Sequence, residues 1–530
     1  MSAAPASTRL RFQSIAIAVT VAGLALLIVS LVGQTDGRLF YLLDDPYIHL
    51  SLAENILSGH YGINPGENAS PSSSILYPFL LVPLLAFGLG DFAALALNLI
   101  GVFGSVWIIA GMIADAFADR SGRFGPMDFL IIVATLIAIN AFALPLVGME
   151  HTLHVYASLA ILNGLIRLPT NGVGVGLVLG IIAAPLLRFE GFALSGAALI
   201  ALVLWGYWAR AILIGVVITA ILAAYVATMT NLGLPILPSS VMVKSSASAA
   251  AVGTDMGGAF SAIVTNLQEA LAYRQAKVLA IGAALLMIGL MALRPNKGVT
   301  TAGFVALAAA IAHLAVGRYD WYSRYEIYII ATMLAKLFSV WGPALSALSK
   351  SAAVKGVLAV AIGFSGYSYL LDTLRSPAAS RGIYTQQFQM HRFATEFYPH
   401  TVAINDLGWM SYRNETHVVD LWGLGSEEVR KLKAEQGIQA DWIDAIAREK
   451  GAVYAMIYDF WFDGQVPETW CKIGSLSAPS VFAGHDTVSI FLIDPPAKDS
   501  LTAAIAEFST TVPTETEIAI FGCAPHAMDS

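Results

Sequence analysis

Charged side chains are scarce in this chain of 530 residues, because Asp, Glu, Lys and Arg together make up 12% of it. Soluble globular proteins carry about twice that share, so the composition excludes an ordinary water-soluble protein. Basic residues are also the minority among the charged ones, since the formal net charge is -7. Without a basic stripe interleaved with aromatic side chains, the sequence excludes nucleic acid as a partner.

Cysteine is nearly absent as well. Cys471 and Cys523 are the only two, and both lie near the end of the chain. Two cysteines exclude a multi-disulfide scaffold. They leave two alternatives open, which are one disulfide if this part of the chain lies outside the cytoplasm, or two free thiols.

Apolar residues are abundant instead, with 57% hydrophobic content and a mean hydropathy of +0.69. They fall into blocks of roughly 16 to 24 residues, the length that a helix needs to cross a bilayer. The blocks stop near residue 371, and the remainder has the composition of a soluble domain with its own core. The sequence therefore predicts a polytopic α-helical membrane protein, with a membrane domain over residues 1–374 and a soluble domain over 375–530.

The positions of Lys and Arg predict the topology, because cytoplasmic loops carry an excess of these residues. Segment 74–90 is short and contains Pro78 and Pro83, so we interpret it as a helix along the outer interface and not as a span. About eleven spans then alternate without conflict, with the N-terminus cytoplasmic and residues 375–530 extracytoplasmic, as expected for a multi-pass protein of the plasma (inner) membrane. They are 13–33, 92–117, 127–147, 152–168, 172–187, 192–208, 211–230, 278–293, 299–315, 326–345 and 355–371.

Two adjacent acids, Asp44 and Asp45, open the first predicted outer loop, residues 35–91. They precede a predicted helix over 46–59, with Pro46 in its first turn and Gly59 after its end. One reading makes the acids solvated loop residues or helix caps. The other makes them a functional site, because a single acid is enough for a cap.

Other predicted outer loops carry further charges, namely Glu150 with His151, Arg188, Lys244, and Arg318, Asp320 and Arg324. Acids and cations on one face can transfer a group from a lipid-linked phosphate to a hydroxyl. A carboxylate removes the hydroxyl proton, and fixed cations stabilise the departing phosphate. Paired acids can also bind a divalent cation, the one candidate cofactor, for which Asp45 and Glu150 are the candidate ligands.

The stretch "DDPYIHLSLAENILSGHYGINPGE...SPSSSILYP" from Asp44 onward resembles the first outer loop of membrane glycosyltransferases of the GT-C fold. The resemblance is closest to the mycobacterial arabinofuranosyltransferase type. Further similar segments are "VGMEHTLHVY", "LLRFEGF", "LPILPSSVMVK", "GRYDWYSRYEIYII" and "VAINDLGWMSYRNETHVVDLWGLGSEEV", so the resemblance covers most of the chain. Phe189 replaces a proline of the family pattern, and "PSSV" replaces "PNSF", which leaves donor and acceptor identity open.

The resemblance implies an inverting transferase that moves a sugar, arabinofuranose or another pentose or hexose, from a polyprenyl-phosphate donor to a hydroxyl. The acceptor is an extracytoplasmic glycan, lipid or protein. By motif, Asp44 is the expected base, with Asp45 and Glu150 also catalytic. Donor phosphate is expected at Arg188, Lys244, Arg318 and Arg324, and acceptor or sugar at Tyr47, His49, Glu54, Asn55, Asn64, His151, Asp320 and Trp321.

Two other functions stay open. Many spans fit a transporter, although transporters usually place ionisable residues near the bilayer midplane and show internal repeats, neither of which is evident. The soluble tail also fits a carbohydrate-binding module. Short strands are predicted at "HTVAIND", "THVVDLWG", "AVYAMIYDFWF" and "TVSIFLIDPP", and a helix is predicted at "SEEVRKLKAEQG". In that α/β domain we expect Asp406 and Asp420 to be strand-end caps, with a role as site acids as the alternative. The tryptophans Trp409, Trp422 and Trp461 are expected to be either core aromatics or residues that stack on sugar rings.

Overall fold

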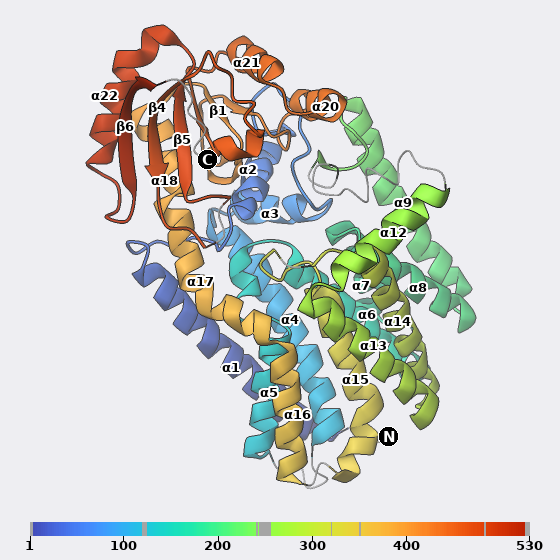
Figure 1. Cartoon of the computed structure of the whole chain (residues 1–530). Helices are drawn as coiled ribbons and strands as arrows, with labels where there is room; N and C mark the ends of the chain where they lie inside the picture. Colours follow the sequence, from blue (N-terminus) through green and yellow to red (C-terminus); the bar gives the residue numbers. More distant parts are fainter. Residues whose placement is uncertain are drawn as a thin grey trace.

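A helical bundle and a mixed α/β domain make up the molecule (Figure 1). The structure, a computed structural model, describes residues 4–118, 124–239, 242, 256–319, 321–348, 351–481 and 484–524. The α/β domain covers one end of the bundle, and the N-terminus lies toward the other end (Figure 1). The predicted fold class, a polytopic helical protein with a C-terminal α/β domain, is confirmed at this level.

Long apolar helices form the bundle, and each predicted span falls on one of them or on a pair in succession. Their bounds are α1 Ala6–Gly33, α4 Phe92–Phe117, α5 Pro126–Ala138, η1 Leu144–Val147, α6 His151–Asn171, α7 Val175–Leu187, α8 Gly191–Leu204, α9 Trp208–Asn231, α12 Met256–Ala270, α13 Arg274–Leu293, α14 Lys297–Val316, α15 Ile327–Leu348 and α16 Ala352–Ser365.

By length and hydropathy, six described helices can each cross a membrane, or seven if the bent pair Ala352–Ser365 and Tyr367–Phe397 counts as one span. The larger number of about eleven also counts α6 and the apolar helices α5, α7 and α8, of which the last three have 13 or 14 residues. The chain is a multi-pass membrane protein by these criteria. The number of spans and the side on which each loop lies stay predictions.

The first loop folds into two short helices between the bundle and the α/β domain (Figure 1). The predicted helix over 46–59 is confirmed as α2 Asp45–Leu57, with Pro46 in its first turn. Gly59 follows its end at φ +84°, a left-handed conformation that glycine adopts without strain. Segment 74–90 contains only the ten-residue helix α3 Tyr77–Ala86, which is too short to span a bilayer.

Helix α17 Tyr367–Thr385 leads from the bundle into the α/β domain, so the predicted boundary at 374/375 falls inside a helix. The domain continues with α18 Gln387–Arg392, a π-helical turn Phe393–Phe397, α19 Gly408–Ser411, α20 Glu427–Gln436, α21 Ala440–Glu449, 3-10 turns Asp459–Phe462 and Pro495–Ala497, and α22 Lys498–Ser509. The predicted helix at "SEEVRKLKAEQG" is confirmed as α20. The Ser426 hydroxyl caps it by accepting a hydrogen bond from the Val429 amide.

The sheet has the order β2-β1-β3-β5-β4-β6, with β1 parallel to β2 and β3 and the other pairs antiparallel. The strands are β1 Val402–Ile404, β2 Val418–Asp420, β3 Tyr454–Ile457, β4 Cys471–Ser477, β5 Thr487–Leu492 and β6 Glu517–Ala524. Of the two alternatives for the cysteines, the structure has the disulfide, and Cys471–Cys523 joins β4 to β6.

Polar contacts fasten the first loop to the α/β domain. The Asn64 side-chain amide donates to the Val418 carbonyl (2.8 Å) and accepts from the Val418 amide (2.9 Å), so it pairs with β2 as a neighbouring strand would. Glu67 forms ion pairs with Lys450 (2.9 Å) and with His417 (3.3 Å). The hydrogen bonds from His417, Lys450 and Asn64 lower the pKa of Glu67 to about 2, against the opposing effect of burial. The two domains are therefore joined through this loop.

Candidate active site

The second acid of the pair, Asp45, lies against a buried arginine from a distant loop. Arg324 Nη2 lies 2.6 Å from Asp45 Oδ2, and the side chains of the two residues are 1% and 18% exposed. Arg324 precedes α15, and the three residues before it, Trp321, Tyr322 and Ser323, all have φ between 49° and 63°. Left-handed φ values are costly for such residues and cluster at functional sites. The loop before α15 thus adopts an unfavourable backbone conformation, and in this conformation Arg324 contacts Asp45.

A second ion pair lies at the start of α6. Glu150 is fully buried, and its Oε1 accepts from Arg188 Nη1 at 2.8 Å and from the Ser73 hydroxyl at 3.0 Å. His49 Nε2 lies 3.8 Å from the other carboxylate oxygen. Arg188 also binds both carboxylate oxygens of Glu190, at 2.9 and 3.2 Å. Burial alone would raise the pKa of Glu190, but the charge and hydrogen bonds of Arg188 bring it to about 2.

Tyr325 connects the two ion pairs. The guanidinium carbons of Arg188 and Arg324 each lie 5.2 Å from the centroid of its ring. The His151 ring lies 6.1 Å from the same centroid and is 2% exposed. Within the described part of the chain, neither ring nitrogen of His151 has a hydrogen-bond partner. Buried imidazole nitrogens without partners are rare, so His151 offers polar atoms for a ligand at this cluster.

The first acid, Asp44, faces the α/β domain. Its Oδ1 accepts a hydrogen bond from the Trp409 backbone amide at 2.9 Å. A Cβ at Gly408 would lie 2.0 Å from Asp44 Oδ2, so only glycine fits there. Burial raises the pKa of the Asp44 carboxyl well above its usual value, and the charges of Asp406 and Asp45 raise it further. The tail therefore contributes to the surroundings of Asp44.

Several other predicted site residues have structural contacts. Tyr47 is fully buried, with its ring 4.2 Å from that of Trp409. Glu54 pairs with Arg413 at 3.2 Å. The Asn55 amide donates to the carbonyls of residues 62 and 63, at 2.8 and 3.0 Å, and so shapes the turn after α2. Asn64 is hydrogen-bonded to β2, so these four predicted residues stabilise the conformation of the first loop.

The remaining predicted residues are exposed or lie outside the described residues. Lys244 and Asp320 are outside the described residues. Arg318 is exposed after the end of α14, and Trp321 is 55% exposed. The structure thus joins Asp45, His49, Glu150, His151, Arg188 and Arg324, with Asp44 beside them.

The residues named for a divalent cation are both bound to arginines, Asp45 to Arg324 and Glu150 to Arg188. Across the described ranges, no three His, Cys, Asp or Glu side chains converge as a metal site. In this arrangement each candidate ligand is paired with an arginine, and the divalent cation stays a prediction.

Four residues of the site were missed or underweighted in the sequence. Ser73 comes from a serine run that looks like a turn, and Tyr325 follows a predicted arginine without a signal of its own. Glu190 is the acid of the quoted loop segment "LLRFEGF", but it was not predicted as a site residue. Gly408 lies in the quoted tail segment "NDLGW", but the spacing gives no sign that it meets Asp44.

Some acids and tryptophans of the tail have the structural roles that the sequence predicted. Asp420 accepts backbone hydrogen bonds from Trp422 (2.8 Å) and from Gly425 (2.6 Å), so it is confirmed as an acid that organises the turn after β2. Trp409 is 6% exposed and packs as a core aromatic. Asp406 lies near Asp44, since its charge contributes to the raised pKa of that residue.

Comparison with known proteins gives one partial family match and several similar structures. Residues 379–491 match a domain of unknown function, DUF8728. No curated protein matches the chain. ArnT from Cupriavidus metallidurans, in its apo state, has a TM-score of 0.50 at 12% identity, over 90% of this chain and 98% of that one.

Oligosaccharyltransferase structures from Archaeoglobus fulgidus are also similar. The complex with Zn and sulfate has a TM-score of 0.48 at 13% identity, over 94% of this chain and 74% of that chain. The AglB complex with an inhibitory peptide and a dolichol-phosphate has a TM-score of 0.44 at 13% identity, over 87% and 73%. At these identities the likeness concerns the fold alone. The arabinofuranosyltransferase subtype stays a prediction. The expected fold is confirmed, since the chain has the GT-C fold.

Proposed function

We propose that the protein is a membrane glycosyltransferase that moves a sugar from a polyprenyl-phosphate donor to a hydroxyl of an extracytoplasmic glycan, lipid or protein. The observation that carries the proposal is the convergence of four loops on one cluster. The Asp44–Asp45 pair, Glu150, Arg188 and Arg324 come together there from positions up to 280 residues apart in the sequence. Two arginines beside a carboxylate pair match the needs of phosphate departure and hydroxyl activation.

In the proposed step the acceptor hydroxyl oxygen attacks the anomeric carbon of the donor sugar. The bond from that carbon to the phosphate oxygen breaks, the phosphate leaves with the electron pair, and the hydroxyl proton passes to an Asp44 carboxylate oxygen. Attack opposite the leaving group inverts the anomeric centre. The raised pKa of Asp44 supports this role, because a general base works best when its pKa approaches the working pH. Asp45, by contrast, is engaged with Arg324.

The arginines supply the positive charge for the leaving phosphate. Arg188 and Arg324 flank the Tyr325 ring, with side chains only 10% and 1% exposed. Guanidinium groups bind phosphate oxygens through two parallel hydrogen bonds, and a low-dielectric surrounding strengthens such bonds. The unpartnered nitrogens of His151 offer a further donor beside the same ring. A departing phosphate would be stabilised at this place.

An apolar cavity next to the cluster supports a lipid-linked donor. It has a volume of about 250 Å³ and is lined by Ile75, Leu76, Phe79, Leu186, Ile221, Ala224, Tyr225, Thr228 and Met229. Its lining residue Leu186 is two positions from Arg188, and the Ser74 hydroxyl donates to the Leu186 carbonyl at 3.3 Å. The first isoprene units of a donor would fit here while its phosphate reaches the arginines.

Ala224→Trp is expected to raise KM for a long polyprenyl-phosphate donor by about tenfold, because an indole in this cavity excludes the isoprene chain. A donor with a short prenyl tail should lose less. Ala224 is exposed on α9, so the fold should tolerate the change. Ala223→Trp, on the same helix and exposed but outside the cavity lining, is the matched control. Equal KM values for both variants would contradict the proposed donor position.

The predicted orientation places the cluster and the tail outside the cytoplasm. The Cys471–Cys523 disulfide supports this, since disulfides persist in oxidising compartments.

The proposal is tested by transfer assays with purified protein in nanodiscs. A panel of polyprenyl-phosphate sugars, arabinofuranose and hexoses included, is incubated with glycan, lipid and peptide acceptors, and Asp44→Asn protein serves as the inactive reference. We expect transfer from at least one donor by the unaltered protein alone. If no donor in the panel is consumed while vesicles show sugar uptake by the protein, the transporter interpretation replaces the transferase.

A further inference from the structure

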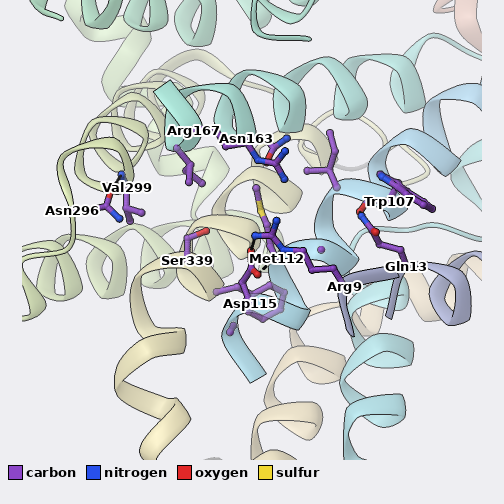
Figure 2. A pocket seen from close by; sticks show the side chains of 15 residues that line it. Arg9, Gln13, Trp107, Met112, Asp115, Asn163, Arg167, Asn296, Val299 and Ser339 are labelled. Atoms are coloured by element: carbon purple, nitrogen blue, oxygen red, sulfur yellow. Dashed lines mark hydrogen bonds and ion pairs between the residues drawn. The ribbon is translucent and has the colours of Figure 1, made fainter. Parts of the chain in front are cut away.

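A second cavity, which has polar side chains in its lining, lies between helices α1, α4, α6, α14 and α15, away from the candidate active site. Its volume is about 240 Å³. The lining residues are Arg9, Gln13, Trp107, Ile108, Gly111, Met112, Asp115, Ala116, Asn163, Ile166, Arg167, Asn296, Val299, Phe338 and Ser339. Figure 2 shows Asn163 and Arg167 on one side of it and Arg9 with Asp115 on the other. Five helices that are distant in sequence thus build one polar recess within an apolar bundle.

This cavity is at the opposite end of the bundle from the cluster at Glu150. Helix α6 begins beside Glu150 and carries Arg167 17 residues further along. At 1.5 Å rise per residue, the two positions are about 26 Å apart, close to the thickness of the hydrocarbon core. The charge pattern places Arg9 and Arg167 at cytoplasmic ends of spans. The cavity therefore lies at the level of the inner leaflet if the active site faces outward.

The charges that line the cavity sum to +1. Arg9 Nε donates to Asp115 Oδ1 at 2.7 Å, so these two charges neutralise each other. Arg167 is exposed, lines the cavity, and has no ion pair with any acid in the described ranges. Asn163 lies one helical turn before Arg167 and makes no side-chain hydrogen bond within those ranges. One guanidinium and one amide are thus available to an anion.

Apolar side chains from the same helices also line the cavity, among them Met112, Ile166 and Phe338. Trp107 on α4 is 45% exposed, so the cavity lining includes a residue at the surface of the bundle. The volume is below the range of roughly 300 to 1,000 Å³ that drug-sized ligands occupy, so the site suits a small polar group.

We propose that this cavity binds the phosphate headgroup of an anionic phospholipid from the inner leaflet. Arg167 and Asn163 bind the phosphate oxygens, while the acyl chains remain in the bilayer beside the exposed Trp107. Basic recesses between membrane helices are a common place for anionic headgroups. The bound lipid would tie α6 to α1 and α4 at their cytoplasmic ends. The site is separate from the proposed transferase site, and its test does not depend on catalysis.

The experiment measures lipid retention by native mass spectrometry of protein purified in detergent and exposed to phosphatidylglycerol, phosphatidylcholine or inorganic phosphate. We expect phosphatidylglycerol to be retained, and retention to fall about tenfold in Arg167→Gln, since a hydrogen-bonded charge is lost. Arg167→Lys should restore part of it. Arg210→Gln removes an arginine that stacks on Tyr207 outside the cavity, and it should retain lipid as the unaltered protein does.

Three results would overturn the proposal. One is equal retention of phosphatidylcholine and phosphatidylglycerol, which would show that the cavity does not select lipids by the net charge of the headgroup. Another is unchanged retention in Arg167→Gln, with the melting temperature of the variant confirming its fold. The third is displacement of phosphatidylglycerol by millimolar inorganic phosphate, which would make this a site for a free anion and not for a lipid.

Discussion

Asp44→Asn is expected to reduce kcat/KM of sugar transfer by about 10² to 10⁴, because a general base contributes a factor of this size. Asparagine keeps the shape of aspartate, and its side-chain oxygen can still accept the hydrogen bond from the Trp409 amide. The α/β domain should therefore stay docked, so that the loss reports chemistry and not folding. Transfer from the best donor of the panel, with the melting temperature of each protein, measures both.

The pH dependence of the same reaction is a second test of Asp44 as the general base. Burial first, and the charge of Asp406 next, raise the pKa of Asp44. A base must be deprotonated to act, so activity should fall as pH decreases through that raised pKa, at a pH above the usual range of an exposed aspartate. Asp463→Asn, in an exposed position of the tail, is the control for general effects. Full activity of Asp44→Asn would refute the assignment of the base.

Arg188→Met is expected to lower the free energy of unfolding by about 3 to 5 kcal/mol, because it leaves buried carboxylates without their partner. Glu150 is 0% exposed and Glu190 22% exposed, and both depend on this guanidinium. Arg188→Lys should recover only part of the loss, since an ammonium cannot bind two carboxylates in the same forked way. Denaturant unfolding in detergent, followed by tryptophan fluorescence, gives the difference.

The chain contains a matched control for this change. Arg413 also bridges two acids, Glu54 and Asp91, each at 3.2 Å, but its side chain is 50% exposed. Water screens such a pair, so Arg413→Met should cost only about 0 to 1 kcal/mol. Equal losses for the two arginines would contradict the importance of burial at Arg188. Transfer activity should disappear in Arg188→Met alone.

Much of the fold was predictable because the apolar blocks and the Lys and Arg positions carry a strong signal. Each predicted span falls on helical structure. The helix that begins at Asp45 appears where Pro46 and Gly59 indicate, and the helix after Ser426 appears where its serine cap and terminal glycine indicate. The strands β4 and β6 were missed, because "CKIGSLS" and "EIAIFGCA" mix Gly, Ser and charged residues without clear alternation. Their membership in the sheet is decided by tertiary pairing.

The candidate site was predictable as a set of loops but not as a set of contacts. Charge placement put Asp45, Glu150, Arg188 and Arg324 on one face, and the structure joins them in pairs. Nothing in their spacing shows that Arg324 pairs with Asp45 and Arg188 with Glu150, since 279 and 38 residues separate the partners. The approach of Gly408 to Asp44 depends on how the α/β domain docks, which no local pattern encodes.

The pairing of Asn64 with β2 has a consequence for aggregation. β2 is an edge strand, and an open edge is a template on which a second copy can add a strand. In the intact chain the Asn64 amide occupies both polar groups of Val418, so the edge is closed by the membrane domain itself. A tail severed from the first loop would lose that cover and expose a strand ready for intermolecular pairing. The first loop of the membrane domain thus protects the tail against aggregation through β2.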